Sequence, residues 1–191
     1  MTDKKMRIGV LALQGAFQLH QKHIEALGAE YVPVITSQDF LKIDGLILPG
    51  GESATMLKLI DAVGIQDTLT DFFKVKPVWG ICAGAILMAK SVSNPAQKSF
   101  GVIDIEIERN AYGRQLESQH ETIEDYEVAS IRAPKIVKVG KDIHVLAKRS
   151  GDPTWLEFQK LMVTTFHPET NLSAPSPWHR RFLEYCFSVT M

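Results

Sequence analysis

The chain has 191 residues, of which 45% are hydrophobic and 23% are charged, and its formal net charge is -1. These values are ordinary for a globular protein of this size, so we expect one domain over residues 1–191. Because neither sign of charge is in excess, neither nucleic acid nor an anionic membrane surface is expected as the main partner.

Targeting signals are not evident in the sequence. The first residues carry charges without a long apolar run, and no segment approaches the roughly 20 apolar residues that cross a bilayer. Two cysteines, Cys82 and Cys186, are too few for a disulfide framework and suit a reducing compartment. We therefore predict a cytoplasmic protein.

In the first half of the chain, strand-like and helix-like segments alternate. The predicted strands lie at 7–13, 31–35, 43–48 and 77–81. One predicted helix follows a turn at Gln14 and Gly15 and ends near Leu27, and two more lie at 53–63 and 65–73. Near-continuous apolar strands that alternate with helices are typical of a parallel sheet covered on both faces.

The second half changes character. Short strands are predicted at 100–108, 126–132, 136–139, 143–148 and 161–166, with a turn at 150–153 and mobile loops at 93–99 and 110–125. A final helix at 178–189 carries an apolar stripe. The predicted fold is therefore three-layer α/β and flavodoxin-like, with a mostly parallel central sheet, helices on both faces and added antiparallel strands.

The most informative segment is PVWGICAGAILMA at 77–89, which places Cys82 between Gly80 and Gly84 after a short apolar run. This arrangement is the cysteine counterpart of the nucleophile elbow, which needs small neighbours because the backbone is crowded there. A cysteine at a helix N-terminus is favoured as the thiolate. Cys82 is thus a candidate nucleophile, although a buried cysteine in a βα unit has the same pattern.

A candidate base lies in His167-Pro168-Glu169, directly after the last predicted strand. If strand geometry continued, residues i and i+2 would point to the same side, so His167 and Glu169 would lie together. This spacing suits a general base and its orienting carboxylate, and with Cys82 it favours a Cys-His-Glu triad. His20 and His23, on the first helix, are expected to be solvated or at an interface.

The loop Pro49-Gly50-Gly51-Glu52-Ser53 ends one predicted strand and opens a helix. Adjacent glycines let backbone N–H groups turn toward a ligand, here the oxyanion of an acyl-transfer intermediate. A phosphate-binding loop is the alternative, but neither glycine-rich phosphate motif is present.

Two arginines stand at predicted strand ends. Arg109 and Arg132 are placed to grip a carboxylate, or else to carry ordinary surface charge. The sequence contains no recognisable metal-ligand motif, so no metal is expected.

Several sequence blocks together resemble the class I, triad-type glutamine amidotransferases. Within that class the chain is most similar to the glutaminase branch that serves pyridoxal 5′-phosphate synthase. The class is carried by WGICAGAILMAK at 79–90 and FHPE at 166–169, and the branch by IGVLALQGAF at 8–17, DGLILPGGESATM at 44–56, ERNAYGRQ at 108–115 and SIRAP at 130–134.

This resemblance implies hydrolysis of L-glutamine to glutamate and ammonia, with Cys82 as nucleophile, His167 as general base and Glu169 as its orienting partner. It further implies that the substrate is held by Gly51, Glu52, Ser53, Arg109, Ile131 and Arg132. The ammonia would pass to a (β/α)₈-barrel synthase subunit that makes pyridoxal 5′-phosphate, and no metal or organic cofactor is needed.

Two other functions remain open at this point. The chain could serve a different synthase, such as the barrel cyclase of histidine biosynthesis, although the ERNAYGRQ and SIRAP blocks argue against it. It could instead be a redox sensor in which Cys82 is an oxidation target. That function leaves His167, Glu169 and both arginines unexplained.

Overall fold

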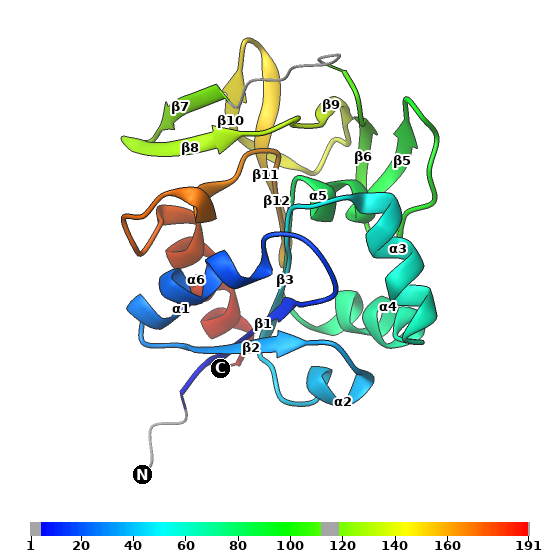
Figure 1. The fold of residues 1–191 in the computed structure, drawn as a ribbon. Coiled ribbons are helices and arrows are strands. Elements are labelled where there is room, and N and C mark those ends of the chain that lie inside the picture. The colour runs from blue at the N-terminus through cyan, green and yellow to red at the C-terminus, as the bar shows by residue number, and fades with distance from the viewer. Residues whose placement is uncertain (1–4, 112–118, 191) are drawn as a thin grey trace.

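In the computed structural model, residues 5–111 and 119–190 are described, and they form a layered α/β structure (Figure 1). The described residues contain a seven-stranded sheet in the order β10-β11-β12-β4-β3-β1-β2. Its parallel strands are β1 (Arg7–Leu11), β2 (Glu30–Val34), β3 (Gly45–Leu48), β4 (Val78–Ile81) and β12 (Leu161–Thr164). The sheet is extended by two antiparallel strands, β10 (His144–Arg149) and β11 (Asp152–Phe158).

Helices cover the two faces of this sheet (Figure 1). One face is covered by α1 (Gln21–Ala26) and α6 (Pro177–Thr190), and the other by α3 (Ser53–Ala62), α4 (Gln66–Val75) and α5 (Ala83–Met88). A short α2 (Ser37–Phe40) follows β2, and two 3₁₀ turns, η1 (Phe17–His20) and η2 (Pro168–Thr170), precede α1 and follow β12.

The central strands divide the core into two clusters, because successive side chains of a strand point to opposite faces. In β4, Trp79 and Ile81 pack on the α1/α6 side, whereas Val78 packs on the α3/α4/α5 side. In β12, Met162 faces α1 and α6 while Val163 faces the other helices. Both faces of each central strand are buried, which accounts for their near-continuous apolar sequences.

Two smaller sheets lie beyond the C-terminal ends of the central strands (Figure 1). The first joins β5 (Ala89–Ser93), β6 (Ile103–Glu108) and β9 (Lys135–Val139), and the second is the hairpin of β7 (Gln119–Ile123) and β8 (Tyr126–Ser130). A backbone bridge joins Ala129 of β8 to His167.

The predicted fold class is confirmed, including the antiparallel additions, but several elements differ. The loop predicted at 110–125 is wrong over 119–123, which form β7, and its residues 112–118 lie outside the described part of the chain. The helix predicted from Gln14 to Leu27 is a 3₁₀ turn followed by the short α1. The short elements β5 and α2 and the seven-residue strand β11 were not predicted.

Candidate active site

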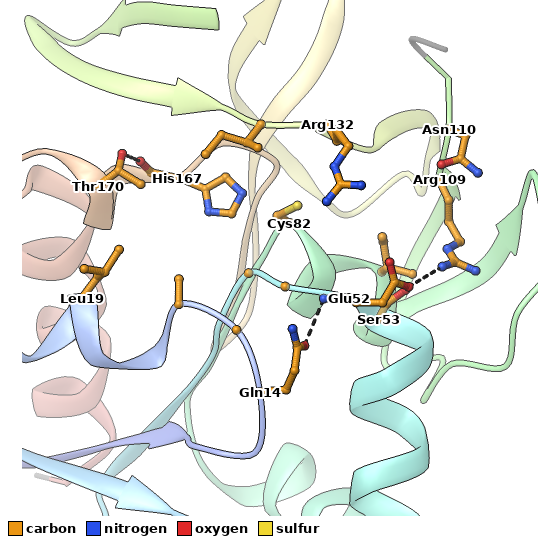
Figure 2. A pocket seen from close by; sticks show the side chains of 16 residues that line it. Gln14, Leu19, Glu52, Ser53, Cys82, Arg109, Asn110, Arg132, His167 and Thr170 are labelled. Carbon is orange, nitrogen blue, oxygen red and sulfur yellow. Dashed lines mark hydrogen bonds and ion pairs between the residues drawn. The ribbon is translucent and has the colours of Figure 1, made fainter. Parts of the chain in front are cut away.

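The C-terminal ends of four neighbouring strands meet at one pocket of about 380 Å³. The segment after β1 brings Gln14, the loop after β3 brings Gly50, Cys82 follows β4 directly, and His167 follows β12. Ligand sites in open α/β sheets form at this edge, outside the carboxyl ends of the strands. Figure 2 shows Cys82 and His167, which follow the adjacent strands β4 and β12, both facing this space.

Cys82 occupies the sharp turn between β4 and α5. Its backbone has φ 48° and ψ −99°, a conformation that costs a non-glycine residue about 1–3 kcal/mol and occurs mainly at functional sites. Two hydrogen bonds hold the turn, because Cys82 N–H donates to the Thr164 carbonyl at 2.8 Å and Ile86 N–H donates to the Cys82 carbonyl at 3.1 Å. The sulfur-bearing residue itself, rather than a neighbouring glycine, carries the strain.

The glycines on either side of Cys82 are needed for close packing. A Cβ on Gly84 would lie 2.1 Å from the Leu48 carbonyl oxygen of β3, and a Cβ on Gly80 would lie 2.6 Å from Met88 Sδ. Neither glycine has a left-handed backbone, since the positive φ falls on Cys82. The two glycines let α5 lie directly against the sheet.

His167 and Glu169 form a buried pair. His167 Nδ1 lies 2.7 Å from Glu169 Oε1, and the Glu169 side chain is fully buried. The two residues lie together as predicted, but not on a continued strand, because β12 ends at Thr164 and Glu169 lies in the 3₁₀ turn η2. The His167 backbone is fixed separately, by its N–H donating to the Ala129 carbonyl at 2.8 Å.

Each member of the His167–Glu169 pair favours the charged form of the other. Burial by itself would lower the pKa of His167, but the charges of Cys82 and Glu169, with hydrogen bonds to both, raise it well above its usual range. For Glu169, burial raises the pKa, but the charge and hydrogen bond of His167 outweigh it and hold the pKa below 4.5. The arrangement therefore favours the protonated imidazole of His167, which lies between Cys82 and the Glu169 carboxylate.

The loop after β3 runs along the pocket beside His167. A Cβ on Gly50 would lie 2.2 Å from His167 Cε1, so the loop approaches the imidazole as closely as a glycine allows. The loop is tied to the segment after β1, because Ala16 N–H donates to the Gly50 carbonyl and Glu52 N–H donates to Gln14 Oε1, both at 3.0 Å (Figure 2). The Glu52 N–H is therefore turned to Gln14 rather than to the pocket.

The predicted arginines both reach the pocket. Arg109 follows β6, and its Nη2 donates to Glu52 Oε1 at 2.9 Å, while Glu52 remains 54% exposed (Figure 2). Arg132 comes two residues after β8 with a positive φ of 45°, and it lines the pocket together with Ile131. The two cations lie opposite His167, where a substrate carboxylate would meet them.

The pocket brings together eight of the nine predicted site residues, while the ninth, Glu169, lies behind His167. The lining residues are Gln14, Gly15, Ala16, Leu19, Gly50, Gly51, Glu52, Ser53, Cys82, Ile86, Arg109, Asn110, Ile131, Arg132, His167 and Thr170. Of these, Leu19 and Thr170 were not foreseen, because each lies in a 3₁₀ turn that carries no periodic signal. Asn110 stands within the ERNAYGRQ block, which could have indicated it.

The prediction for His20 and His23 is wrong. Both side chains are fully buried, because both rings pack against His179 of α6 and His20 also packs against Trp79 of β4.

The described residues show neither a metal site nor a membrane-spanning helix. Within residues 5–111 and 119–190, no group of three or more His, Cys, Asp or Glu side chains is arranged to hold a metal ion. The helices in the same part of the chain are all too short or too polar to span a membrane.

Comparison with known proteins gives the family of the chain. Residues 10–187 match the model of the SNO glutamine amidotransferase family. A protein of Koribacter versatilis named pyridoxal 5′-phosphate synthase subunit PdxT is 47% identical, with 94% of this chain and 95% of that protein covered. The protein of the same name from Solibacter usitatus is 48% identical over 85% of this chain and 91% of that protein.

A solved structure agrees with these matches. A crystal structure described as a glutamine amidotransferase is 36% identical to the chain and superimposes with a TM-score of 0.85, covering 94% of this chain and 98% of that one. The fold, the strand-end pocket and the match over nearly the whole length thus lead to one assignment. The chain belongs to the SNO glutamine amidotransferase family.

Proposed function

We propose that this protein is the glutaminase subunit of a pyridoxal 5′-phosphate synthase and that it hydrolyses L-glutamine to L-glutamate and ammonia. The observation that carries the proposal is Cys82, strained at the head of α5, in one pocket with His167, whose imidazole is paired with the buried Glu169. Membership of a glutamine amidotransferase family and relatives named as synthase subunits support the same assignment.

In the first half of the reaction, His167 takes the thiol proton and Cys82 attacks the γ-carboxamide carbon of glutamine. Backbone N–H groups of the loop at Gly50 and Gly51 receive the negative charge that develops on the amide oxygen. As the C–N bond breaks, the imidazolium gives its proton to the leaving amide nitrogen, which departs as ammonia. The γ-glutamyl group remains on the sulfur as a thioester.

In the second half, His167 takes a proton from water, and the resulting hydroxide attacks the thioester carbonyl carbon. The C–S bond breaks, glutamate leaves, and the proton on His167 returns to the Cys82 sulfur. Glu169 holds the imidazole in one tautomer through its bond to Nδ1 and stabilises the imidazolium in both halves. The cycle needs no metal or organic cofactor.

Substrate recognition rests on charge. Arg109 and Arg132 supply cations for the α-carboxylate of glutamine, and Ile131 lies beside them at the pocket. Gly51, Glu52 and Ser53 form the wall on the side of α3. The ammonia then passes to a (β/α)₈-barrel synthase subunit, which uses it in making pyridoxal 5′-phosphate, and both subunits work in the cytoplasm.

A matched pair of cysteine variants tests the proposal. Cys82→Ala should release no glutamate above background while still folding and binding the barrel subunit. Cys186→Ala, at the other cysteine of the chain, lies on α6 away from the pocket and should keep the wild-type rate. A glutamine-analogue electrophile should label Cys82 and not Cys186 by mass spectrometry. Substantial glutaminase activity in Cys82→Ala would refute the mechanism.

A further inference from the structure

Behind the triad lies a buried cluster of three histidines that the proposed mechanism does not use. His20, His23 and His179 are all fully buried between η1, α1 and α6. His20 Nδ1 lies 2.9 Å from His179 Nε2, and the rings of His23 and His179 stack with their centroids 4.4 Å apart. Because η1 packs against η2, the cluster adjoins the turn that carries Glu169.

All three rings are uncharged at neutral pH. Burial lowers the pKa of His20 to about 4, and it lowers the pKa values of His23 and His179 in the same direction. Each neutral imidazole carries one proton, so one of its nitrogens donates a hydrogen bond and the other accepts. The hydrogen-bond partners of each ring therefore indicate which of its two nitrogens carries the proton.

The proton on His23 is fixed by a backbone group. Ser176 N–H donates to His23 Nδ1 at 3.1 Å, so Nδ1 accepts and the proton must be on Nε2. That Nε2 lies 3.3 Å from the backbone carbonyl of Glu169 and donates to it. His23 thus makes a hydrogen bond to the main chain of Glu169 and none to its carboxyl group.

The pair His20 and His179 allows two proton arrangements. In the first, Ser176 Oγ–H donates to His179 Nδ1 (2.6 Å), His179 Nε2–H donates to His20 Nδ1, and His20 carries its proton on Nε2. In the second, every bond in this series is reversed, so His20 Nε2 carries only a lone pair. The two arrangements therefore differ in whether His20 Nε2 carries a proton or a lone pair.

Glu169 decides between them. Its Oε1 is bonded to His167, but its Oε2 is buried with no hydrogen-bond partner in the described part of the chain, and the same holds for His20 Nε2. The charge of Glu169 acts on His20 across this region. In the field of a nearby carboxylate, an exposed nitrogen lone pair is disfavoured and an N–H is favoured, so the charge of Glu169 selects the first arrangement.

We propose that His20 is a positioning residue of the triad: the Ser176–His179–His20 series sets its Nε2 as a proton-bearing atom, and the partial positive charge of this N–H favours the ionised carboxylate of Glu169. This inference rests on the proposed function of the site. His20 touches neither substrate nor reacting atoms, and it acts by keeping the Glu169 carboxylate ionised and aimed at His167. Without the donor, Glu169 would stabilise the imidazolium of His167 less well.

Two substitutions at His20 separate this role from simple packing. The amide of His20→Asn falls near the position of Nδ1, so it can bond to His179 but offers nothing to Glu169. The amide of His20→Gln reaches the position of Nε2 and can donate to the carboxylate. His23→Gln is the matched control, since His23 is equally buried in the cluster but contacts only the Glu169 backbone.

The first measurement is glutamine hydrolysis in the complex with the barrel subunit. His20→Asn should lower kcat about tenfold, which corresponds to one pKa unit, because the N–H that favours the ionised Glu169 carboxylate is lost, and KM should be nearly unchanged. His20→Gln should recover most of the rate, and His23→Gln should stay near wild type.

The second measurement is the pH dependence of Cys82 alkylation by iodoacetamide, which needs no glutamine. The titratable groups that act on Glu169 are His167 beside it, His20 from η1 and His23 from α1, while His179 of α6 and the Lys22 charge act on these histidines. Of the variants, only His20→Asn should move the alkylation profile to higher pH. In this variant the ionised form of Glu169 is less favoured, so Glu169 stabilises protonated His167 less and a smaller fraction of Cys82 is thiolate at a given pH.

The outcomes decide the proposal. A wild-type kcat and alkylation profile in His20→Asn would overturn it, as would equal losses in His20→Asn and His23→Gln. If His20→Asn does not fold, Ser176→Ala should lower kcat in the same direction by a smaller factor, and an unchanged kcat there would also overturn it. If the wild-type complex releases no glutamate, the proposed function fails, and the alkylation profile still tests His20.

Discussion

At the scale of single residues, the pocket concentrates backbone strain and buried charge at its reacting groups. Cys82 has a positive φ, and Glu169 is a fully buried carboxylate beside His167. Neither feature favours folding on its own, since strained backbone costs about 1–3 kcal/mol and buried charge must be compensated by its partners. Both are therefore expected to show in stability measurements as well as in catalysis.

The strain at Cys82 can be measured with two inactive variants. Glycine tolerates a positive φ, whereas alanine does not, so Cys82→Gly should unfold with a free energy about 1 kcal/mol higher than Cys82→Ala. Urea denaturation of the two variants gives the difference. An alanine variant as stable as the glycine variant would show that the turn relaxes once the sulfur is removed.

The buried pair predicts a pH window of stability. The folded-state pKa of Glu169 is lowered from 4.5, so its contribution is present above pH 4.5 and is lost as the pH falls through the lower folded value. The folded-state pKa of His167 is raised from 6.5, so its contribution is complete below pH 6.5 and is lost as the pH rises through the higher folded value.

Wild type should therefore be more stable than Glu169→Gln. The difference between their unfolding free energies should be largest between pH 4.5 and 6.5. Urea denaturation of both proteins from pH 3 to 9 measures the difference. A difference that does not change with pH would mean that the pair is not ionised in the folded protein. At neutral pH, kcat of Glu169→Gln should fall by about two to four powers of ten, as for other triad acids.

At the scale of elements, the position of the nucleophile depends on how closely α5 approaches β3. Gly84 makes this approach possible, because a side chain there would meet the Leu48 carbonyl at 2.1 Å. Cys82 immediately precedes α5, so any displacement of the helix moves the sulfur relative to His167. Packing between two elements thus controls the geometry of the reacting pair.

Gly84→Ala tests this dependence. We expect it to lower the unfolding free energy by about 1–3 kcal/mol, as overpacked cores do, and to lower kcat even where the protein is folded. Gly64→Ala is the control, since Gly64 has φ +68° at the end of α3 but open space around it. It should be destabilised through its backbone alone and keep the wild-type kcat, so equal kcat values in both variants would contradict the argument.

The sequence predicts the elements that carry strong periodicity and misses those that depend on distant contacts. The central strands are continuous apolar runs, so β3 and β4 were found almost to the residue. The strand β7 was not, because its polar sequence QHETI becomes a strand only by pairing with β8. Local pattern cannot reveal such pairing.

The same distinction applies to the site. The segments around Cys82 and His167 could be located because each combines an apolar strand with an unusual turn. The burial of His20 could not, because it depends on His179, which lies 159 positions further along the chain. The engagement of Glu52 N–H by Gln14, across 38 positions, was hidden for the same reason.

At the scale of the whole molecule, two polar groups of the pocket are held by protein partners. The Glu52 N–H is bonded to Gln14, and the Arg109 guanidinium is paired with the Glu52 carboxyl group. The exposed apolar side chains of Leu19 and Ile131 stand at the same pocket. A partner that covers them would exclude water from the site and strengthen its electrostatic interactions.

We therefore expect weak glutaminase activity from the isolated subunit and clear activation by the barrel subunit. A free glutaminase would release its ammonia to solvent, so coupling to the partner has a functional reason. Glutamate release measured with and without an excess of the barrel subunit tests this expectation. Equal rates would show that the site is already complete in the isolated chain.

The order of the central strands has a consequence for how the protein loses activity. The segments that follow β12, β4, β3 and β1, four adjacent strands, bring the base, the nucleophile, the glycine loop and Gln14 to one edge. Strands in one hydrogen-bonded sheet open together rather than singly. Inactivation should thus be all-or-none: heating would deplete the population of competent molecules, and each surviving molecule would turn over at full speed.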